Sequence, residues 1–369
     1  MTTYATANPF EPWSTTKMLQ APIRDEKPED WYFGQFFINQ MRSDTEWIDF
    51  EKLPIRSRTL APFVKPMGRG HGMFTDKQTG FRFKPANVVV EDAVDPLRPL
   101  TFQPGIGESS IRMGTLSPMQ RLELIKAQMM GEFMTAVERR WEWMKAKAII
   151  DGKVQVTYLD GTSVLVDFQR AAGHTEVLTA GNYFGDAGVS ILDKFQSIVD
   201  TMNNASFGGM PTCITMGGLL GTIVRKDAEI LSHLDKNIAG ATVVVERGII
   251  SGAPGGGKVY KIGTLLIGGA GGQSIEMWVN NETYDVGGAQ IRYVGDYDAV
   301  FTSTPQAING YECFGMIVDR DAAYQAIPIF PKNYLTGERV KVENMSAESA
   351  PLFVPINPNA TYKLTARVA

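Results

Sequence analysis

The segment Gly252-Ala-Pro-Gly-Gly-Gly-Lys258 carries the clearest chemical pattern in the sequence, because its glycine and lysine spacing is that of a phosphate-binding loop. Such a loop needs a serine or threonine after the lysine as a magnesium ligand, and a following helix whose N-terminus faces the phosphate. Here Val259 follows the lysine, and residues 259–267 have the composition of a strand. We therefore expect a loop between two strands. A nucleotide-binding enzyme that uses Lys258 is the least favoured hypothesis.

Other side chains that could do chemistry are few and dispersed. Asp296-x-Asp298 and Asp319-x-Asp321 offer the oxygen ligands that a divalent cation prefers, but neither pair has the glycine-centred spacing of a calcium loop. The histidines and cysteines are spread along the whole chain, at His71, His174, His233, Cys213 and Cys313. We predict no catalytic residue, no metal and no cofactor, and therefore a protein that is not an enzyme.

The composition limits the class of protein further. The chain has 369 residues, enough for two or three domains, and 36 basic against 40 acidic residues give a net charge of −4. This balance argues against a protein that coats nucleic acid by neutralising its phosphates. Two cysteines exclude a disulfide framework and fit a reducing cytoplasm. The sequence shows neither a signal-peptide pattern nor an apolar run of membrane-spanning length, so we expect neither secretion nor a membrane span.

The elements that must position any site begin with a very long helix. Ser117-Pro-Met-Gln120 has the pattern of a helix start, and apolar residues then recur every three or four positions as far as Ala148. This spacing predicts a helix over 117–150, roughly 50 Å long. Asp160-Gly161 between two alternating runs predicts a hairpin over 153–170.

The rest of the chain reads as a mixture of short helices and strands. An amphipathic helix is expected over 187–203, and a glycine-rich β region follows from about residue 210 with one helix near 218–234. The chain ends in strands over 350–368. These elements together predict an α+β fold.

The first 110 residues have few helical signals but many aromatic and proline residues. Residues 1–53 read as an extended arm with nine acidic and five basic residues, a net charge of −4. Residues 54–110 read as a long two-stranded excursion, and between Lys65 and Lys84 five basic residues oppose one acidic residue, a net charge of +4. An isolated hairpin is only marginally stable in water, so this excursion needs a partner surface. The arm either wraps over its own domain or clasps a neighbouring subunit.

This order of elements, together with several short motifs, resembles the major capsid proteins of tailed phages, which have the Hong Kong 97-type fold. The most specific similarity is to the lambda-type head protein, the capsid protein E family. It rests on Phe330-Pro-Lys-Asn-Tyr-Leu-Thr-Gly337, Ser349-Ala-Pro-Leu-Phe-Val354 and Pro358, with weaker matches at Leu53-Pro54, Lys84-Pro85 and Gly152-Lys153. The glycine clusters of residues 207–272 depart from the family pattern.

The resemblance implies a division of the chain. It implies an N-terminal arm, an extended loop, a peripheral domain built on a spine helix, an axial domain, a return to the peripheral domain and C-terminal strands of the axial domain. Their expected ranges are 1–53, 54–110, 111–206 (spine helix 117–150), 207–319, 320–345 and 346–369.

The resemblance also implies a function. Such a protein self-assembles into hexamers and pentamers of an icosahedral phage head that encloses double-stranded DNA without sequence-specific binding. Its expected partners are copies of itself and separate scaffold, portal and decoration proteins. Its expected location is the virion, and the host cytoplasm during assembly. An encapsulin-like nanocompartment shell with the same fold is the main alternative.

The charge split suggests how subunits meet. We hypothesise that the basic loop of one subunit crosses the acidic arm of another, because rim charges set register between partners. The candidate inter-subunit contacts are Trp13, Trp31, Phe36, Phe37 and Trp47 of the arm, and Lys65, Arg69, His71, Lys77, Arg82 and Lys84 of the loop.

Overall fold

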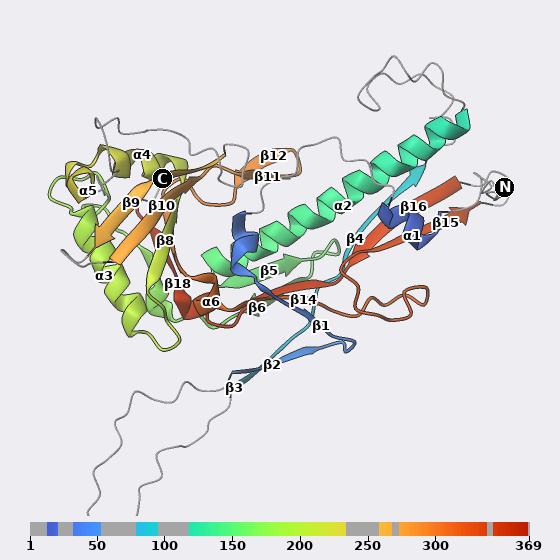
Figure 1. The fold of residues 1–369 in the computed structure, drawn as a ribbon, viewed down its shortest axis with the longest axis horizontal. Coiled ribbons are helices and arrows are strands. Elements are labelled where there is room, and N and C mark those ends of the chain that lie inside the picture. The colour runs from blue at the N-terminus through green and yellow to red at the C-terminus, as the bar shows by residue number, and fades with distance from the viewer. Residues whose placement is uncertain are drawn as a thin grey trace, which may run out of the picture.

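The computed structural model describes residues 13–20, 32–52, 79–94, 118–233, 258–267, 273–337 and 342–367. The molecule is elongated, with a helix-covered sheet at one end and the long helix α2 running from it to the other end (Figure 1). In the described part of the chain, no helix has the length and apolar character needed to cross a membrane.

Helix α2 (Pro118–Ile150, 33 residues) confirms the expected long helix. It ends at Ile150, and Gly152 follows with a positive φ of +66°, a conformation that favours glycine just past a helix end. The Arg170 guanidinium then donates hydrogen bonds to the carbonyls of Ile149 (3.2 Å) and Ile150 (2.8 Å), which the helix leaves without intrahelical donors.

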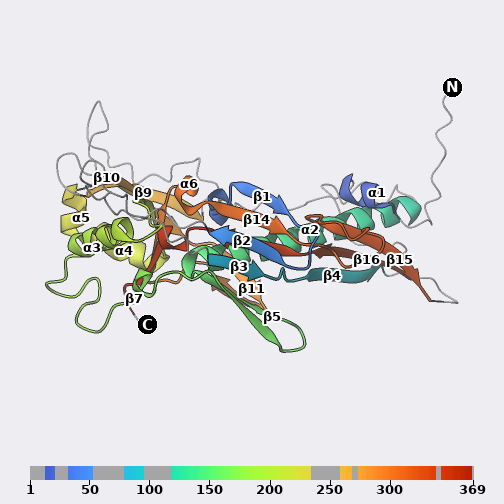
Figure 2. The same cartoon turned by 90° about the horizontal axis from the view of Figure 1, so that it is seen from below.

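The hairpin predicted after the helix is also present. Strands β5 (Lys153–Thr157) and β6 (Ser163–Asp167) pair antiparallel, with Val154 opposite Val166. The turn is closed by the backbone of Tyr158, whose N–H donates to the Thr162 carbonyl at 2.8 Å. The hairpin lies along α2 at its base and projects from the body at its other end (Figure 2).

A six-stranded mixed sheet forms one end of the molecule. Its strands, in spatial order, are β7 (Thr175–Val177), β18 (Thr361–Thr365), β13 (Asp298–Ser303), β8 (Pro211–Met216), β10 (Gln273–Asn280) and β9 (Val259–Ile267). Helices α3 (Ile191–Asn204), α4 (Gly218–Lys226) and α5 (Ala228–His233) cover it. We call the apolar interior of this unit the sheet core.

Two expectations for these helices need correction. Helix α3 was expected with the spine helix in a peripheral unit over 111–206, but its apolar face (Ile191, Phe195, Ile198, Val199 and Met202) lies in the sheet core. The single helix expected near 218–234 is two helices, because Asp227 leaves helical geometry and its carboxylate caps α5 by accepting a hydrogen bond from the Ile230 N–H at 3.0 Å.

A second sheet lies against the N-terminal half of α2. Its order is β15 (Phe330–Thr336), β16 (Val342–Ser349) and β4 (Val88–Val94), and helix α1 (Thr15–Gln20) packs beside it. Trp13, Met18, Met130, Phe133 and Met345 are buried here, in what we call the distal core. Residues 88–94 fall within the two-stranded extended loop expected over 54–110, and they pair with β16 as a strand of this sheet.

The third sheet lies beside the C-terminal half of α2 and has the order β1 (Asn39–Arg42), β14 (Gly310–Phe314) and β17 (Pro351–Pro355). The short helices η1 (Tyr32–Phe36), α6 (Pro305–Ile308) and η4 (Pro358–Ala360) lie around it, and η3 (Ala172–His174) precedes β7. Phe33, Phe36, Phe37, Ile149 and Phe353 are buried among them, in what we call the central core.

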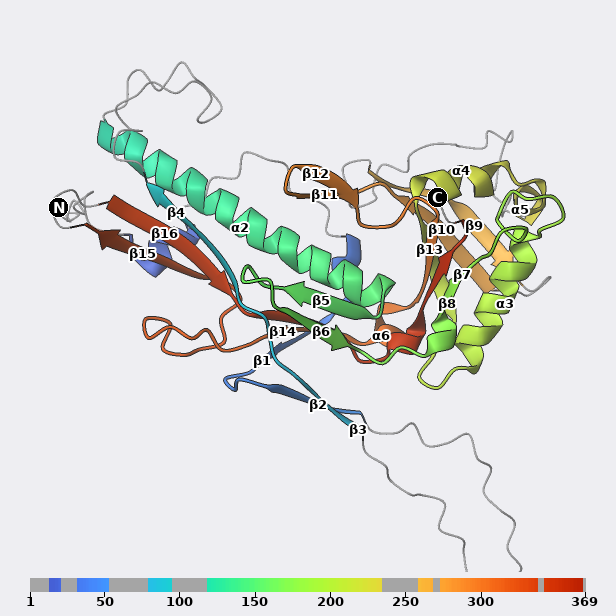
Figure 3. The same cartoon turned by 180° about the vertical axis from the view of Figure 1, so that it is seen from behind.

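Two small ladders complete the fold. Strands β2 (Ile48–Lys52) and β3 (Thr79–Phe83) pair antiparallel on the side of the molecule away from α2 (Figure 3). Strands β11 (Thr283–Val286) and β12 (Ala289–Arg292) form a hairpin near the middle of α2. The last three strands of the chain are divided among the sheets, since β16 joins the second, β17 the third and β18 the first.

Candidate functional site

The β2–β3 ladder brings the predicted acidic arm and basic loop together within one chain. Asp49 lies opposite Arg82 in the register, and the Arg82 guanidinium donates to both carboxylate oxygens, at 2.7 and 3.1 Å. These hydrogen bonds hold the pKa of Asp49 below its ordinary value. Beyond the strand, the Lys84 ammonium donates to Glu46 at 2.7 Å. Two of the loop's basic residues therefore meet arm carboxylates of their own chain.

The arm aromatics divide into buried and exposed residues. Trp13 lies in the distal core, and Phe36 and Phe37 lie in the central core, with at most 7% of each side chain exposed. They are buried by their own chain, so they offer no surface to a second copy, and a contact role for these three is not retained. Trp47 is 43% exposed beside the β2–β3 ladder and stays a candidate. The other proposed contacts lie outside the described residues: Trp31, Lys65, Arg69, His71 and Lys77.

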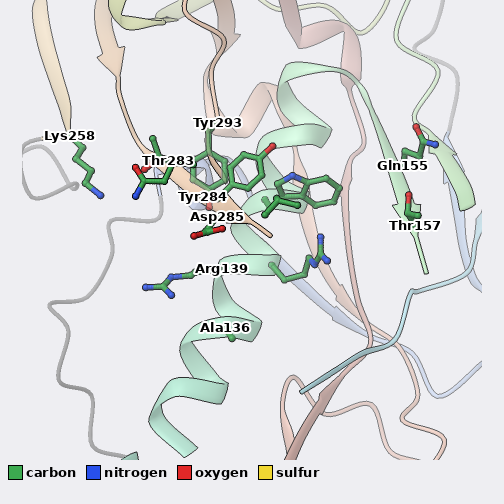
Figure 4. Close-up of a pocket in the computed structure, with 13 residues that line it drawn as sticks. Ala136, Arg139, Gln155, Thr157, Lys258, Thr283, Tyr284, Asp285 and Tyr293 are labelled. Atoms are coloured by element: carbon green, nitrogen blue, oxygen red, sulfur yellow. The ribbon is translucent and has the colours of Figure 1, made fainter. Parts of the chain in front are cut away.

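A groove of about 1000 Å³ lies between α2, the β5–β6 hairpin and the β11–β12 hairpin. Figure 4 shows Gln155 and Thr157 on one wall, with Tyr284 and Asp285 across from them. On its floor the Arg140 guanidinium stacks over the Trp143 ring at 5.1 Å, and the rings of Tyr284 and Tyr293 lie 4.9 Å apart. Aromatic faces beside guanidinium groups are typical of binding surfaces.

The glycine-rich loop that resembled a phosphate site leads into a strand. Lys258 is exposed at the rim of the groove and β9 begins at the next residue, so no helix N-terminus faces a ligand here. The preceding residues 252–257 lie outside the described part of the chain, as does Gly268-Gly-Ala-Gly-Gly272.

The acidic pairs contact cations of the chain itself. The Lys332 ammonium lies 2.6 Å from Asp319 and 2.9 Å from Asp321, and Arg292 pairs with Asp296. Asp298 accepts a hydrogen bond from Thr365 at 2.6 Å. Over the described ranges, no three His, Cys, Asp or Glu side chains are grouped as metal ligands would be.

Cys313 and His174 are buried, and Cys213 is half-buried. Burial raises the pKa of Cys313 to about 12 and also raises the pKa of Cys213, so both are held as thiols. The Tyr32 hydroxyl lies 3.4 Å from the Cys213 sulfur and 2.7 Å from the Thr215 hydroxyl. His174 Nδ1 lies 3.0 Å from the Thr361 carbonyl oxygen, and burial lowers its pKa.

Exposed apolar side chains gather at the end of the β5–β6 hairpin. Leu159 is fully exposed, at 110% of its reference area, and Leu165, Val164 and Tyr158 are 57%, 48% and 37% exposed. The sequence predicted this hairpin but not the groove beside it, because the groove joins residues 136–157 to residues 258 and 283–293, which lie about 100 or more positions later and share no motif with them.

Comparisons with known proteins give this geometry a context. Residues 14–366 match the family described as phage major capsid protein E. A protein from a prophage of E. coli CFT073, described as a capsid protein, has a TM-score of 0.67 at 17% identity, and the match covers 96% of this chain and 99% of that one. No curated protein matches the sequence.

Two further structures are more distant. The capsid of cyanophage P-SCSP1u matches with a TM-score of 0.47 at 10% identity, over 93% of this chain and 90% of that one. An encapsulin from Synechococcus elongatus PCC 7942 matches with a TM-score of 0.45 at 7% identity, over 96% and 95%. These two scores are too low to carry an argument. The family match extends over nearly the whole chain, and the prophage structure shares its fold, so the chain belongs to the phage major capsid protein E family and has the Hong Kong 97-type capsid fold.

Proposed function

We propose that this chain forms the shell of a tailed-phage head as hexamers and pentamers, and that the shell encloses double-stranded DNA. The observation that carries the proposal is the β2–β3 ladder. It lies outside all three cores except for inward-facing residues such as Ile48 and Phe50, and it displays ion pairs and Trp47 at the surface. A ladder of this kind reaches beyond its own domain and suits a contact with a second copy.

The ion pairs refine the hypothesis about the arm and the loop. Arg82 and Lys84 are joined to Asp49 and Glu46 in the same chain, so we propose that arm and loop dock on a neighbour as one paired unit. The exposed pairs set the register of this unit and contribute little to folding, because exposed ion pairs are screened by water.

The shell needs other proteins in this proposal. Separate scaffold, portal and decoration proteins assist assembly in the host cytoplasm, and the finished protein is located in the virion. A net charge of −4 suits a shell that encloses DNA without binding it tightly.

Electron microscopy of the expressed protein tests the proposal directly. We expect shells, tubes or hexamers, and a preparation that stays monomeric at all concentrations would contradict it. The contents separate the two shell hypotheses, since a nanocompartment holds an enzyme and a phage head holds DNA. A titration with ATP tests the remaining hypothesis, and micromolar affinity that is lost in Lys258→Ala would overturn the structural role.

The role of the ladder is tested by Arg82→Glu, which places like charges opposite each other at Asp49. We expect assembly to fall while the circular dichroism of the subunit stays unchanged. The matched control is Lys194→Glu, which breaks a partly exposed ion pair between α3 and β7, outside the ladder and outside the groove. If both variants assemble equally well, the ladder does not form part of the interface between subunits.

A further inference from the structure

We propose that the tip of the β5–β6 hairpin, residues 158–162, docks into the groove between α2 and the β11–β12 hairpin of a second copy of this chain. The inference rests on the proposed function, since it names one contact through which the subunits of a capsomer meet. Three observations support it: the tip is apolar, the groove has a suitable size and charge, and the hairpin turns its apolar face away from its own groove.

The apolar face of the hairpin continues past the edge of the body. Val154 and Val166 lie opposite each other and are buried in the central core. Val164 and Tyr158 follow on the same face, because side chains alternate along a strand, but they are 48% and 37% exposed. Leu159 then lies fully exposed at the turn. An apolar face that is buried in the core at one end and exposed to solvent at the other is typical of an interaction site.

The groove has the size and lining to receive this tip. Its volume of about 1000 Å³ is at the upper end of the roughly 300–1,000 Å³ of pockets that bury a compact ligand. Trp143 and Tyr284 supply apolar surface. Three basic residues, Arg139, Arg140 and Lys258, outnumber the one lining carboxylate, Asp285, so the groove is positive on balance. The tip carries one charge of the opposite sign, the Asp160 carboxylate.

The turn holds Asp160 in a fixed, ionised position. Its carboxylate accepts hydrogen bonds from the Thr162 N–H at 2.9 Å and from the Thr162 hydroxyl at 2.6 Å. A tip that is ordered before it binds loses less conformational entropy on docking. Leu159 and Asp160 are adjacent, so one insertion brings an apolar side chain to the aromatic rings and a carboxylate to the basic residues.

The hairpin cannot fill the groove of its own chain. Gln155 and Thr157 line that groove, and they lie on the face of β5 opposite to Val154. The apolar face therefore points away from its own groove, which leaves a second copy as the occupant. Tip and groove are different surfaces, so the contact is head-to-tail and closes into a ring when the rotation between subunits allows it.

Disulfide trapping in assembled particles tests the contact. The variant Leu159→Cys/Val286→Cys places one thiol on the tip and one at the exposed wall of the groove, where Val286 is 56% exposed. The native Cys313 is fully buried and does not compete. After oxidation with copper–phenanthroline, we expect a ladder of linked multimers on a non-reducing gel. Particles co-assembled from the two single variants are expected to give dimers only.

The matched control is Leu159→Cys/Leu219→Cys, which moves the second thiol to an exposed position on α4 and is expected to stay monomeric on the gel. Dimers from Leu159→Cys alone would show that tip meets tip and would overturn the proposal. Unlinked subunits from the first double variant, in particles confirmed by electron microscopy, would overturn it too. Wild-type protein that never assembles would instead refute the proposed function.

Hydrogen exchange on the wild-type protein gives a second reading that needs no variant. Assembly is expected to slow amide exchange at least tenfold in both 158–162 and 283–292. Unchanged exchange in either segment, in particles that electron microscopy confirms, would exclude the contact.

Discussion

Lys126 is completely buried where α2 meets α1 and β16, and its replacement by methionine tests the packing of the distal core. Its ammonium lies 2.5 Å from the Glu343 carboxylate, a charge contact without the alignment of a hydrogen bond, and 5.7 Å from the Trp13 ring. Only 13% of the Glu343 side chain is exposed. The Asn333 amide also donates to this carboxylate, at 2.5 Å.

The magnitude follows from what Lys126→Met leaves behind. Methionine fills the space of the lysine stem, but Glu343 keeps a nearly buried charge with no cation beside it. Removing one partner of a buried ion pair lowers the free energy of unfolding by about 3–5 kcal/mol. Replacing both partners with uncharged side chains often changes it little. We therefore expect Lys126→Met/Glu343→Gln to be more stable than Lys126→Met, because the amide oxygen of glutamine still accepts from Asn333.

The assay is urea unfolding followed by circular dichroism, with subunits kept below the concentration at which they assemble. The control is Lys17→Met, since Lys17 lies on α1 and pairs with Glu123 where both side chains are 43–44% exposed. That pair should be worth at most about 1 kcal/mol. A loss in Lys126→Met no larger than in the control would refute the reasoning, because Glu343 would then not be left buried and uncompensated.

Three further predictions concern backbone strain and pH. Gly152→Ala should lower the free energy of unfolding in urea by about 1–2 kcal/mol, because alanine is strained at φ +66° and its Cβ would lie 2.9 Å from the Arg170 Cβ; equal stability would refute this. Burial raises the pKa of Asp151, but Lys363 at 2.9 Å and Lys147 outweigh this and hold the pKa below its ordinary value. The resulting stability is present above about pH 4 and is lost as the pH falls through the folded-state pKa. The loss caused by Lys363→Met should therefore shrink as the pH falls below about 4, and a gap that is independent of pH would contradict it. Burial lowers the pKa of His174 below 6.5, so the wild type should lose stability as the pH falls from 6.5 toward the folded-state pKa, and His174→Gln should flatten that part of the curve.

The elements that sequence predicted well are those fixed by neighbours in the chain. The apolar spacing from Leu122 to Ala148 gave the long helix within one residue, and Asp160-Gly161 gave the hairpin turn. A regular period or a turn dipeptide acts over a few residues, so it is visible without knowledge of tertiary contacts. The strand after Lys258 was predicted for the same reason.

The features that sequence missed depend on contacts between distant segments. Phe36 and Phe37 were candidates for contacts with a neighbouring subunit, but the other alternative holds for them, because Phe353, more than 300 positions later, packs against Phe37 at 5.8 Å. The sequence predicted the apolar face of α3 correctly. It did not show which surface this face packs on, because the residues of the helix itself do not distinguish Phe301 of the sheet core from α2. The groove had no signal at all, since the Trp143 and Tyr284 that line it share no motif.

The last three strands are divided among three sheets, and this affects how an incompletely synthesised chain can fold. Strand β16 completes the sheet of the distal core, β17 that of the central core, and β18 lies inside the six-stranded sheet. None of the three cores can close before residues 342–367 have emerged from the ribosome, so the folding of all three waits for these residues. A polypeptide cut short by interrupted translation lacks a strand in every layer at once. We expect such a fragment to stay unfolded, because each of its three cores lacks a strand.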